Sequence, residues 1–245
     1  HRKGALVMLG MAALNATVFI PYLGFPRPIA AGSDELTVMV ANVNSANRDH
    51  ERLFQVLEAE NPDVLIALEI NARWEHALLA TTYSFPYRVI EAREDNFGIA
   101  LLSRHPIHDV EIRTFDVSDV PSIQSTIGDG DRSFTVIATH PLPPGGPAYV
   151  AARNEHLRNL AIATEEINGP LIVAGDLNTT PWNRRFKALL REGNLSHSSK
   201  GLGVAASWPT NLPPMRIPID HVLHSDDFEA VYVRWPEASE VITCP

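Results

Sequence analysis

The chain alternates between unbroken apolar runs and helical periodicity, which predicts an interleaved order of strands and helices. Residues 36–44 (LTVMVANVN) and 64–70 (VLIALEI) are almost entirely apolar, as is typical of strands buried on both faces. Between them, residues 50–61 carry apolar side chains at helical spacing, and Pro62 ends that pattern. A further short helix is expected over residues 73–80.

The middle and the end of the chain continue this order. Short β-like runs with turn signals between them cover residues 87–92, 97–104, 108–115, 121–127 and 133–140. A long helix over residues 148–167 leads to a strand over residues 171–178. Thr180 and Pro181 suit an N-cap and a first helical position, which predicts a helix through Leu190. The last predicted strands cover residues 219–224 and 229–235.

Helices towards both ends with a β-meander between them predict an α/β protein whose helices cover the faces of its sheets. Of the 245 residues, 45% are hydrophobic and 20% are charged, which is a globular composition. We therefore expect one large domain over residues 34–245, preceded by a separate segment over residues 1–33.

That first segment contains an uncharged stretch, residues 4–26, which follows Arg2 and Lys3. About 20 apolar residues are enough to cross a bilayer, so a membrane helix or anchor is the favoured interpretation. A cleaved signal peptide, with residues 29–32 as a weak cleavage site, is the alternative. A buried core helix without a polar face does not suit a domain of this size. Basic residues before the helix predict a cytoplasmic N-terminus and an extracytoplasmic domain.

Charge and cysteine content narrow the classes of function. The chain has 20 basic and 29 acidic residues, which gives a formal net charge of −9. A protein that binds nucleic acid by general phosphate neutralisation is normally basic. The single cysteine, Cys244, excludes an internal disulfide framework and a CxxC metal site.

Polar side chains occur where the predicted strands end. They are Asn42, Asn44, Glu69, His140, Asp176, Asn178 and Asp220. Each has a structural explanation on its own, such as a turn cap at Asn42 or an ion pair of Glu69 with Arg73. Together, several carboxylates and amides with one histidine at a single sheet edge favour a site for a hard metal ion and a phosphate.

The residues of these motifs and their order along the chain resemble those of one family. VANVNS, ALE, GIALLSRHPI, IATH, VAGDLNTTP and PIDHVL follow one another between residues 36 and 233. This series is similar to that of the endonuclease/exonuclease/phosphatase superfamily, which includes DNase I-like nucleases, abasic-site endonucleases, sphingomyelinases and inositol polyphosphate phosphatases. The resemblance implies a four-layer α-β-β-α sandwich of two mixed β-sheets. The hydrophobic start also resembles the bacterial membrane-anchored branch, which implies a location at the bacterial cell membrane.

The resemblance implies a role for each motif residue. Glu69 is the principal ligand of Mg²⁺, for which Mn²⁺ would substitute, and Asn42 lies beside it as a second metal ligand. Asp176 orients or deprotonates the attacking water, and Asn178 holds that water and a phosphate oxygen. His140 donates to the phosphate. Asp220 orients a catalytic histidine nearer the C-terminus.

The implied activity is Mg²⁺-dependent hydrolysis of a phosphoester by direct attack of water. The net charge of −9 and the expected membrane tether favour a lipid-linked or small phosphorylated substrate. The protein is expected to be a monomer. A DNA or RNA endonuclease and a catalytically impaired binding or scaffold member stay open as alternatives. Asn44, Trp182 and Trp208 join Asn178 as candidate substrate contacts.

Two further groups are expected to be structural. Successive residues of a strand face opposite sides, so His221 should point away from the side of Asp220. Arg153 and Asn154 are expected on a solvated face of the helix over residues 148–167.

The C-terminal end departs from the family pattern. Members normally carry a serine-aspartate-histidine motif followed by a last apolar strand, whereas residues 239–241 are serine, glutamate and valine. We expect no last strand after them and an incomplete C-terminal end. Valine can neither donate to a phosphate nor move a proton, and loss of one general acid–base group commonly lowers a rate about 10²–10⁴-fold. The expectation is an intact metal site at Glu69 with weak hydrolytic activity.

Overall fold

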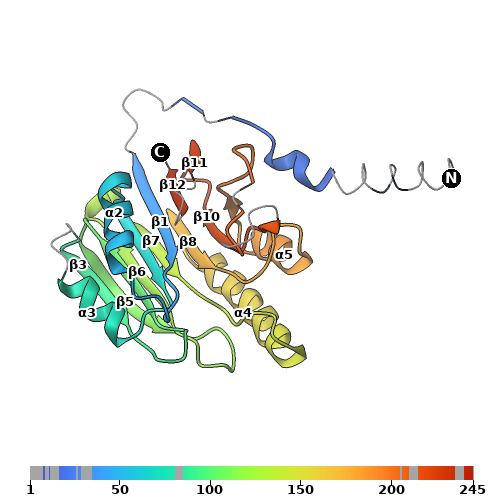
Figure 1. The fold of residues 1–245 in the computed structure, drawn as a ribbon. Coiled ribbons are helices and arrows are strands. Elements are labelled where there is room, and N and C mark those ends of the chain that lie inside the picture. Colours follow the sequence, from blue (N-terminus) through green and yellow to red (C-terminus); the bar gives the residue numbers. More distant parts are fainter. Residues whose placement is uncertain are drawn as a thin grey trace.

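Figure 1 presents the fold as a computed structural model, which describes residues 8, 11, 17–25, 27–28, 35–80, 85–204, 206–209, 215–234 and 240–244. Two six-stranded sheets account for the strands of these ranges. The first sheet has the order β11-β12-β1-β2-β4-β3, and the second has the order β5-β6-β7-β8-β10-β9.

The first sheet is mixed. Its strands are β1 (Leu36–Asn42), β2 (Val64–Leu68), β3 (Tyr87–Glu91), β4 (Ile99–Ser103), β11 (Tyr232–Arg234) and β12 (Glu240–Cys244). β1 and β2 run parallel, and the other neighbouring pairs run antiparallel. The parallel pair is connected by the helix α2 (His50–Glu60), because parallel neighbours require a crossover.

The second sheet repeats this arrangement. Its strands are β5 (Ile107–Arg113), β6 (Ser122–Ile127), β7 (Phe134–Ala138), β8 (Leu171–Asp176), β9 (Ser196–His197) and β10 (Asp220–His224). β7 and β8 are its parallel pair, and the helix α4 (Pro147–Glu165) connects them. The remaining elements are α3 (Ala72–Ala80), α5 (Arg184–Glu192) and the 3-10 helices η1 (Thr17–Tyr22) and η2 (Gly130–Arg132).

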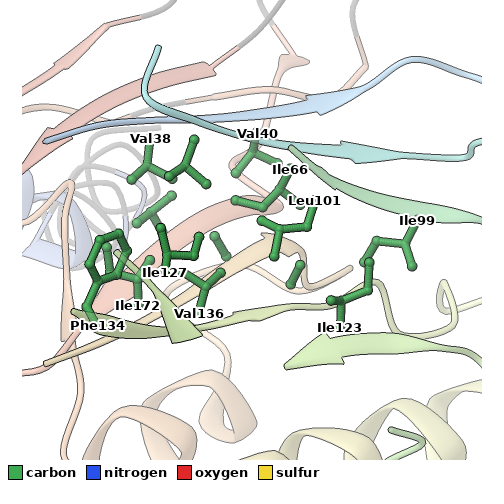
Figure 2. Close-up of a cluster of buried hydrophobic side chains, with 14 of the residues drawn as sticks. Val38, Val40, Ile66, Ile99, Leu101, Ile123, Ile127, Phe134, Val136 and Ile172 are labelled. Carbon is green, nitrogen blue, oxygen red and sulfur yellow. The ribbon is translucent and has the colours of Figure 1, made fainter. Parts of the chain in front are cut away.

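Successive side chains of each strand point to opposite faces of its sheet. They form one hydrophobic cluster between the two sheets and one more between each sheet and its helices. In β1, Val38 and Val40 point between the sheets, where Figure 2 shows them opposite side chains of the second sheet such as Val136. Met39 instead packs outward in a cluster that includes buried residues of α2 and α3. A third cluster holds α4 and α5 against the outer face of the second sheet, for example through Leu157. The predicted α-β-β-α sandwich is therefore confirmed, with two mixed sheets.

The start of α5 corrects one prediction. Helix α5 begins at Arg184 rather than near Pro181, and its N-cap is Asn183, whose side chain accepts a hydrogen bond from the Arg185 N–H at 2.8 Å. The Asn183 N–H donates to the Thr180 carbonyl at 3.0 Å, which closes a turn with Pro181 in its second position. Proline suits that turn position as well as a first helical position, so the sequence signal fits both structures.

The end of the described chain corrects another prediction. A last strand is present, since β12 pairs antiparallel with β1, with Leu36 opposite Cys244, and also with β11. The expectation of no last strand was therefore wrong. The run of β-branched residues at 241–243 suits this position, because such residues favour extended backbone.

The expected membrane helix over residues 4–26 lies largely outside the described residues. Its described part includes η1, in which no residue is buried. No helix among the described ranges is long and apolar enough to cross a bilayer. The helix and the domain division at residues 33 and 34 stay predictions.

Candidate active site

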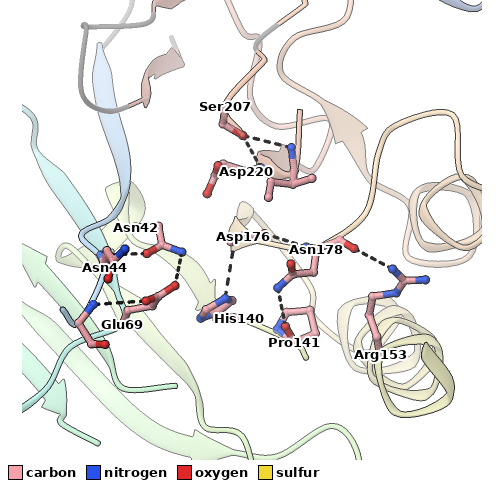
Figure 3. Close-up of polar contacts among 12 residues, drawn as sticks. Asn42, Asn44, Glu69, His140, Pro141, Arg153, Asp176, Asn178, Ser207 and Asp220 are labelled. Carbon is pink, nitrogen blue, oxygen red and sulfur yellow. Dashed lines mark hydrogen bonds and ion pairs between the residues drawn. The ribbon is translucent and has the colours of Figure 1, made fainter. Parts of the chain in front are cut away.

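The polar residues singled out from the sequence gather at one rim of the sandwich (Figure 3). Asn42 ends β1 and Glu69 follows β2, while His140 follows β7 and Asp176 ends β8. Asp220 begins β10 and pairs directly opposite Asp176. Both sheets thus deliver side chains to the same place, the first through Asn42 and Glu69 and the second through the other three residues.

Glu69 and Asn42 form the part of the site that belongs to the first sheet. The Asn42 Nδ2 donates to the Glu69 Oε1 at 2.9 Å, and the Ser45 N–H donates to the Glu69 Oε2 at 3.3 Å. The Asn42 Oδ1 accepts from the Asn44 N–H at 3.2 Å. The carboxylate is therefore held in place by two neutral donors and has no cationic partner among these contacts.

Three residues of the rim have left-handed backbone conformations. The φ angles are 59° at Asn44, 62° at Glu69 and 49° at Asn178. Asparagine tolerates this region, but a left-handed glutamate costs roughly 1–2 kcal/mol. Such conformations are concentrated at functional sites, because the surrounding structure holds side chains there in directions that ordinary strand backbone would not give.

Asp176 and Asp220 are opposite each other on the neighbouring strands β8 and β10. Burial, followed by the charge of Asp220, holds the pKa of Asp176 well above its ordinary value, although hydrogen bonds from Asn178 and Asn42 act in the opposite direction. Burial also raises the pKa of Asp220 to about 6, and the charge of Glu69 contributes. The Asp220 Oδ1 is buried without a hydrogen-bond partner in the described structure.

This donor set fits a hard divalent cation. Burial raises the pKa of Asp176 and of Asp220, the charge of Glu69 raises both further, and one buried oxygen of Asp220 has no partner in the described structure, so a cation would offset the negative charge here. No group of three histidine, cysteine, aspartate or glutamate side chains within the described ranges is arranged to hold a metal by itself. Glu69 and Asn42 would thus supply a carboxylate and an amide oxygen, and Mg²⁺ commonly completes such a set with water and phosphate.

His140 is a buried, neutral histidine. Burial lowers its pKa to about 4, and the nearby charge of His156 adds to this effect. Its Nε2 lies 3.9 Å from the Asp176 Oδ2, and its Nδ1 is buried without a partner in the described structure. The ring therefore stays uncharged at neutral pH and keeps one N–H to donate.

Asn178 is tied to its surroundings through three groups. Its backbone N–H donates to the Asp176 Oδ1 at 2.8 Å, and its Nδ2 donates to the Pro141 carbonyl at 2.9 Å. Its own carbonyl accepts from the Arg153 Nη1 at 2.8 Å. Arg153 is only 7% exposed, so the expectation of a solvated position was wrong for this residue. It lies on the inward face of α4, where a helical arginine reaches a neighbouring loop.

The glycine of the GDLN motif, Gly175, is at a position where a larger residue does not fit. Gly175 has a φ of 151°, and a Cβ added there would lie 1.8 Å from the Thr139 carbonyl oxygen. Only glycine lets the ends of β7 and β8 approach this closely. Since His140 directly follows Thr139 and Asp176 directly follows Gly175, this contact sets the distance between them.

A buried polar chain behind His140 was not predicted from the sequence. The His156 Nδ1 lies 2.8 Å from the Asp116 Oδ2, and its Nε2 lies 2.7 Å from the Thr139 Oγ1. That hydroxyl is in turn 2.7 Å from the Ser122 Oγ. His156 lies three residues after Arg153 and therefore on the same helical face, which the sequence had predicted to be solvated.

His221 is structural, as predicted. It is 1% exposed, and its Nε2 lies 2.9 Å from the Thr179 carbonyl oxygen. Its Nδ1 lies 3.1 Å from the Nε2 of His197, a second buried histidine that the sequence did not single out. The ring of Phe186 packs against both histidines.

The three candidate substrate contacts have different surroundings. The Asn44 Oδ1 accepts from the Ala46 N–H at 3.0 Å, so part of this side chain is used within its own turn. Trp182 contacts the ring of Phe19 edge to face, with centroids 5.4 Å apart. Trp208 is 57% exposed and follows Ser207, whose hydroxyl accepts from the Asp220 N–H at 3.3 Å.

Solved structures with this fold include a sphingomyelinase, a beta toxin and TDP2. Sphingomyelinase C from Streptomyces griseocarneus has a TM-score of 0.64 and 18% identity, over 86% of this chain and 99% of that one. Beta toxin from Staphylococcus aureus, an F277A, P278A mutant with bound magnesium ions, has a TM-score of 0.65 and 16% identity, over 86% and 99%. D. rerio TDP2 complexed with single strand DNA product has a TM-score of 0.70 and 13% identity, over 86% and 98%.

Sequence comparison identifies the family. No curated protein matches the chain. The model of the Endonuclease/Exonuclease/phosphatase family matches residues 39–242, a range that contains every residue of the rim described above. The chain therefore belongs to the endonuclease/exonuclease/phosphatase family, whose members are metal-dependent phosphoester hydrolases.

Proposed function

We propose that this chain hydrolyses a phosphoester bond in a Mg²⁺-dependent reaction. The observation that carries the proposal is the convergence of Glu69, Asp176 and Asp220 with a neutral His140 at one rim. Burying several acids together is unfavourable unless a cation and a substrate use them. Membership of the family supports the same activity.

The metal would be held by Glu69 and Asn42. When bound, Mg²⁺ supplies positive charge that neutralises the charge developing on the phosphoryl oxygens. The Asn42 Nδ2 donates to Glu69 and its Oδ1 accepts from the Asn44 N–H, so turning the amide oxygen towards the ion would exchange both contacts.

Asp176 and Asn178 would position and deprotonate the attacking water. The raised pKa makes Asp176 a better base near neutral pH than an ordinary aspartate. The Asn178 N–H fixes the Asp176 Oδ1, which leaves the Oδ2 for the water. Asn178 anchors its Nδ2 on Pro141, so its side-chain oxygen is the group that accepts from the same water. His140, being neutral, would donate its N–H to a phosphoryl oxygen.

The favoured substrate is lipid-linked or a small phosphorylated molecule, and the chain would be tethered to a bacterial membrane with its domain outside the cytoplasm. The net charge of −9 opposes general binding of duplex nucleic acid. The described part of the N-terminal segment packs against the domain, since Phe19 contacts Trp182 and the Pro21 carbonyl accepts from the Gly201 N–H at 2.9 Å.

The test is an assay panel with and without EDTA. Its substrates are a lipid pyrophosphate, a generic phosphodiester and plasmid DNA, and its matched variant is Asp176→Ala. Turnover that requires Mg²⁺ and is lost in the variant supports the reaction class, whereas metal-independent turnover contradicts it. Salt-sensitive DNA binding with nicking would contradict the proposed lipid-linked substrate and support a nucleic acid as the substrate. Metal binding without turnover on any substrate would favour the scaffold alternative.

The tether has its own test. C-terminal reporter fusions and protease access in intact cells report on which side of the membrane the domain lies. Cytoplasmic fluorescence without membrane fractionation would contradict the proposed topology, and it would leave the reaction class standing.

A further inference from the structure

We propose that Arg153 is a positioning residue for the reaction, which fixes the backbone of Asn178 from helix α4. This inference rests on the proposed function for its kinetic consequence. Its structural core is the 2.8 Å hydrogen bond from the Arg153 Nη1 to the Asn178 carbonyl (Figure 3).

Arg153 is buried without an acidic partner. It is 7% exposed, its Nη2 donates to the Asn154 Oδ1 at 3.3 Å, and its Nε is buried without a partner in the described structure. No carboxylate in the described ranges forms an ion pair with it. A buried guanidinium held mainly by neutral oxygens stabilises a fold poorly. Its clearest contribution is therefore to the group that accepts its strongest hydrogen bond.

That group needs support, because Asn178 has a φ of 49°. A left-handed backbone is less favourable for asparagine than the common regions. The bond from Arg153 holds the carbonyl in the orientation that this conformation requires. If the bond is removed, Asn178 can relax, and its N–H and Nδ2 then leave Asp176 and Pro141 together.

Helix α4 is a rigid base for this contact. One turn further along the same face, His156 is fixed between Asp116 and Thr139, and Thr139 directly precedes His140. The helix thus contacts both loops of the second sheet that carry the reacting groups. A direct contact of Arg153 with substrate is less favoured, because both Nη atoms already donate within the protein.

The experiment compares Arg153→Met and Arg153→Lys with the wild type in the full chain. Arg158→Met is the matched control, since Arg158 lies on α4 with its side chain 58% exposed. A displacement of about 1 Å at a reacting group can lower a rate roughly 10²-fold. We expect Arg153→Met to lower kcat by about 10- to 100-fold with KM nearly unchanged, Arg153→Lys to fall between, and Arg158→Met to match the wild type.

Chemical rescue separates positioning from a merely structural role. In Arg153→Ala, millimolar guanidinium should restore part of kcat by occupying the vacated position, and it should not affect the wild type. A raised KM with unchanged kcat would assign Arg153 to substrate binding and overturn the inference. A loss of stability and activity together, without rescue, would also overturn it.

An activity-free readout keeps this inference distinct from the proposed function. The side-chain amide signal of Asn178 in the ¹⁵N-labelled protein can be assigned by its loss in Asn178→Asp. In the wild type this NH₂ group should exchange slowly, because it donates to Pro141, and it should exchange faster in Arg153→Met. Unchanged exchange in that variant refutes the inference even if the enzyme is active. Altered exchange in a protein without turnover supports it while the proposed function fails.

Discussion

Gly175→Ala tests whether the close approach of β7 and β8 sets the geometry of the site. The added Cβ would lie 1.8 Å from the Thr139 carbonyl oxygen, whereas real Cβ contacts stay above 3.0 Å. The two strand ends must therefore separate by roughly 1.2 Å. That shift moves His140 against Asp176, because each directly follows one of the two clashing residues.

The expected size of the effect follows from two contributions. Overpacking costs about 1–3 kcal/mol, and a side chain at a φ of 151° adds about 1–3 kcal/mol of strain. A relative shift of about 1 Å between two reacting groups lowers the rate by about 10²-fold. We expect the free energy of unfolding to fall by about 2–6 kcal/mol, and kcat/KM to fall by at least about 10²-fold.

Gly146→Ala is the matched control. Gly146 has a φ of 155°, and nothing lies within 4 Å of a Cβ added there. This variant reports the backbone strain without the clash. Denaturant unfolding and steady-state kinetics on both variants separate the two contributions. Equal stability and equal activity of Gly175→Ala and Gly146→Ala would refute the steric argument.

Four further predictions concern charge, protonation and the end of the chain. Glu69→Gln should abolish the Mg²⁺-dependent activity and the rise in melting temperature on adding Mg²⁺, and a retained rise would contradict the assignment of Glu69 as a metal ligand. In EDTA, Asp176→Asn should raise the free energy of unfolding at neutral pH, because a carboxyl whose pKa is raised by folding destabilises the fold increasingly as pH rises above its ordinary pKa. With Mg²⁺ present, the same variant should lower turnover about 10²–10⁴-fold. Burial lowers the pKa of both His140 and His221 to about 4, so the stability that each gives while neutral is lost as pH falls below about 6.5. The free energy of unfolding of the wild type, taken relative to that of His140→Gln or His221→Gln, should be about 1.4 kcal/mol lower at pH 5.5 than at pH 7.5, and a flat difference would contradict burial of that ring in its neutral form. Replacing residues 235–245 by a segment with a serine-aspartate-histidine motif and a following strand should raise turnover. Equal, rapid turnover of the original and the rebuilt chain would mean that the missing histidine does not limit the rate.

The fold was largely predictable because its signal is local. A strand buried between a helix layer and a second sheet must be apolar on both faces, and β1 satisfies this with Val38 and Met39 pointing in opposite directions. The ends of such strands meet at one edge, so polar residues placed there converge. For Asn42, Glu69 and Asp176 this reasoning gave the correct rim.

What the sequence could not indicate depends on contacts distant along the chain. Arg153 faces inward because the Asn178 carbonyl lies within its reach, and no helical periodicity records that carbonyl. The left-handed backbone of Glu69 is held by tertiary contacts such as those with Asn42 and Ser45, against the preference of glutamate itself. The network of His156 likewise needs Asp116, which lies in a loop between two other strands.

The pairing of β12 with β1 has a consequence for the order of folding during synthesis. β1 lies near the beginning of the domain and β12 is among the last described residues, yet they are neighbours in the first sheet. While a ribosome is still producing the chain, the outer edge of β1 exposes unpaired N–H and C=O groups that invite pairing with other chains. The domain can close this edge only after nearly all of its residues have emerged. Nascent chains should therefore depend on chaperones until β12 arrives.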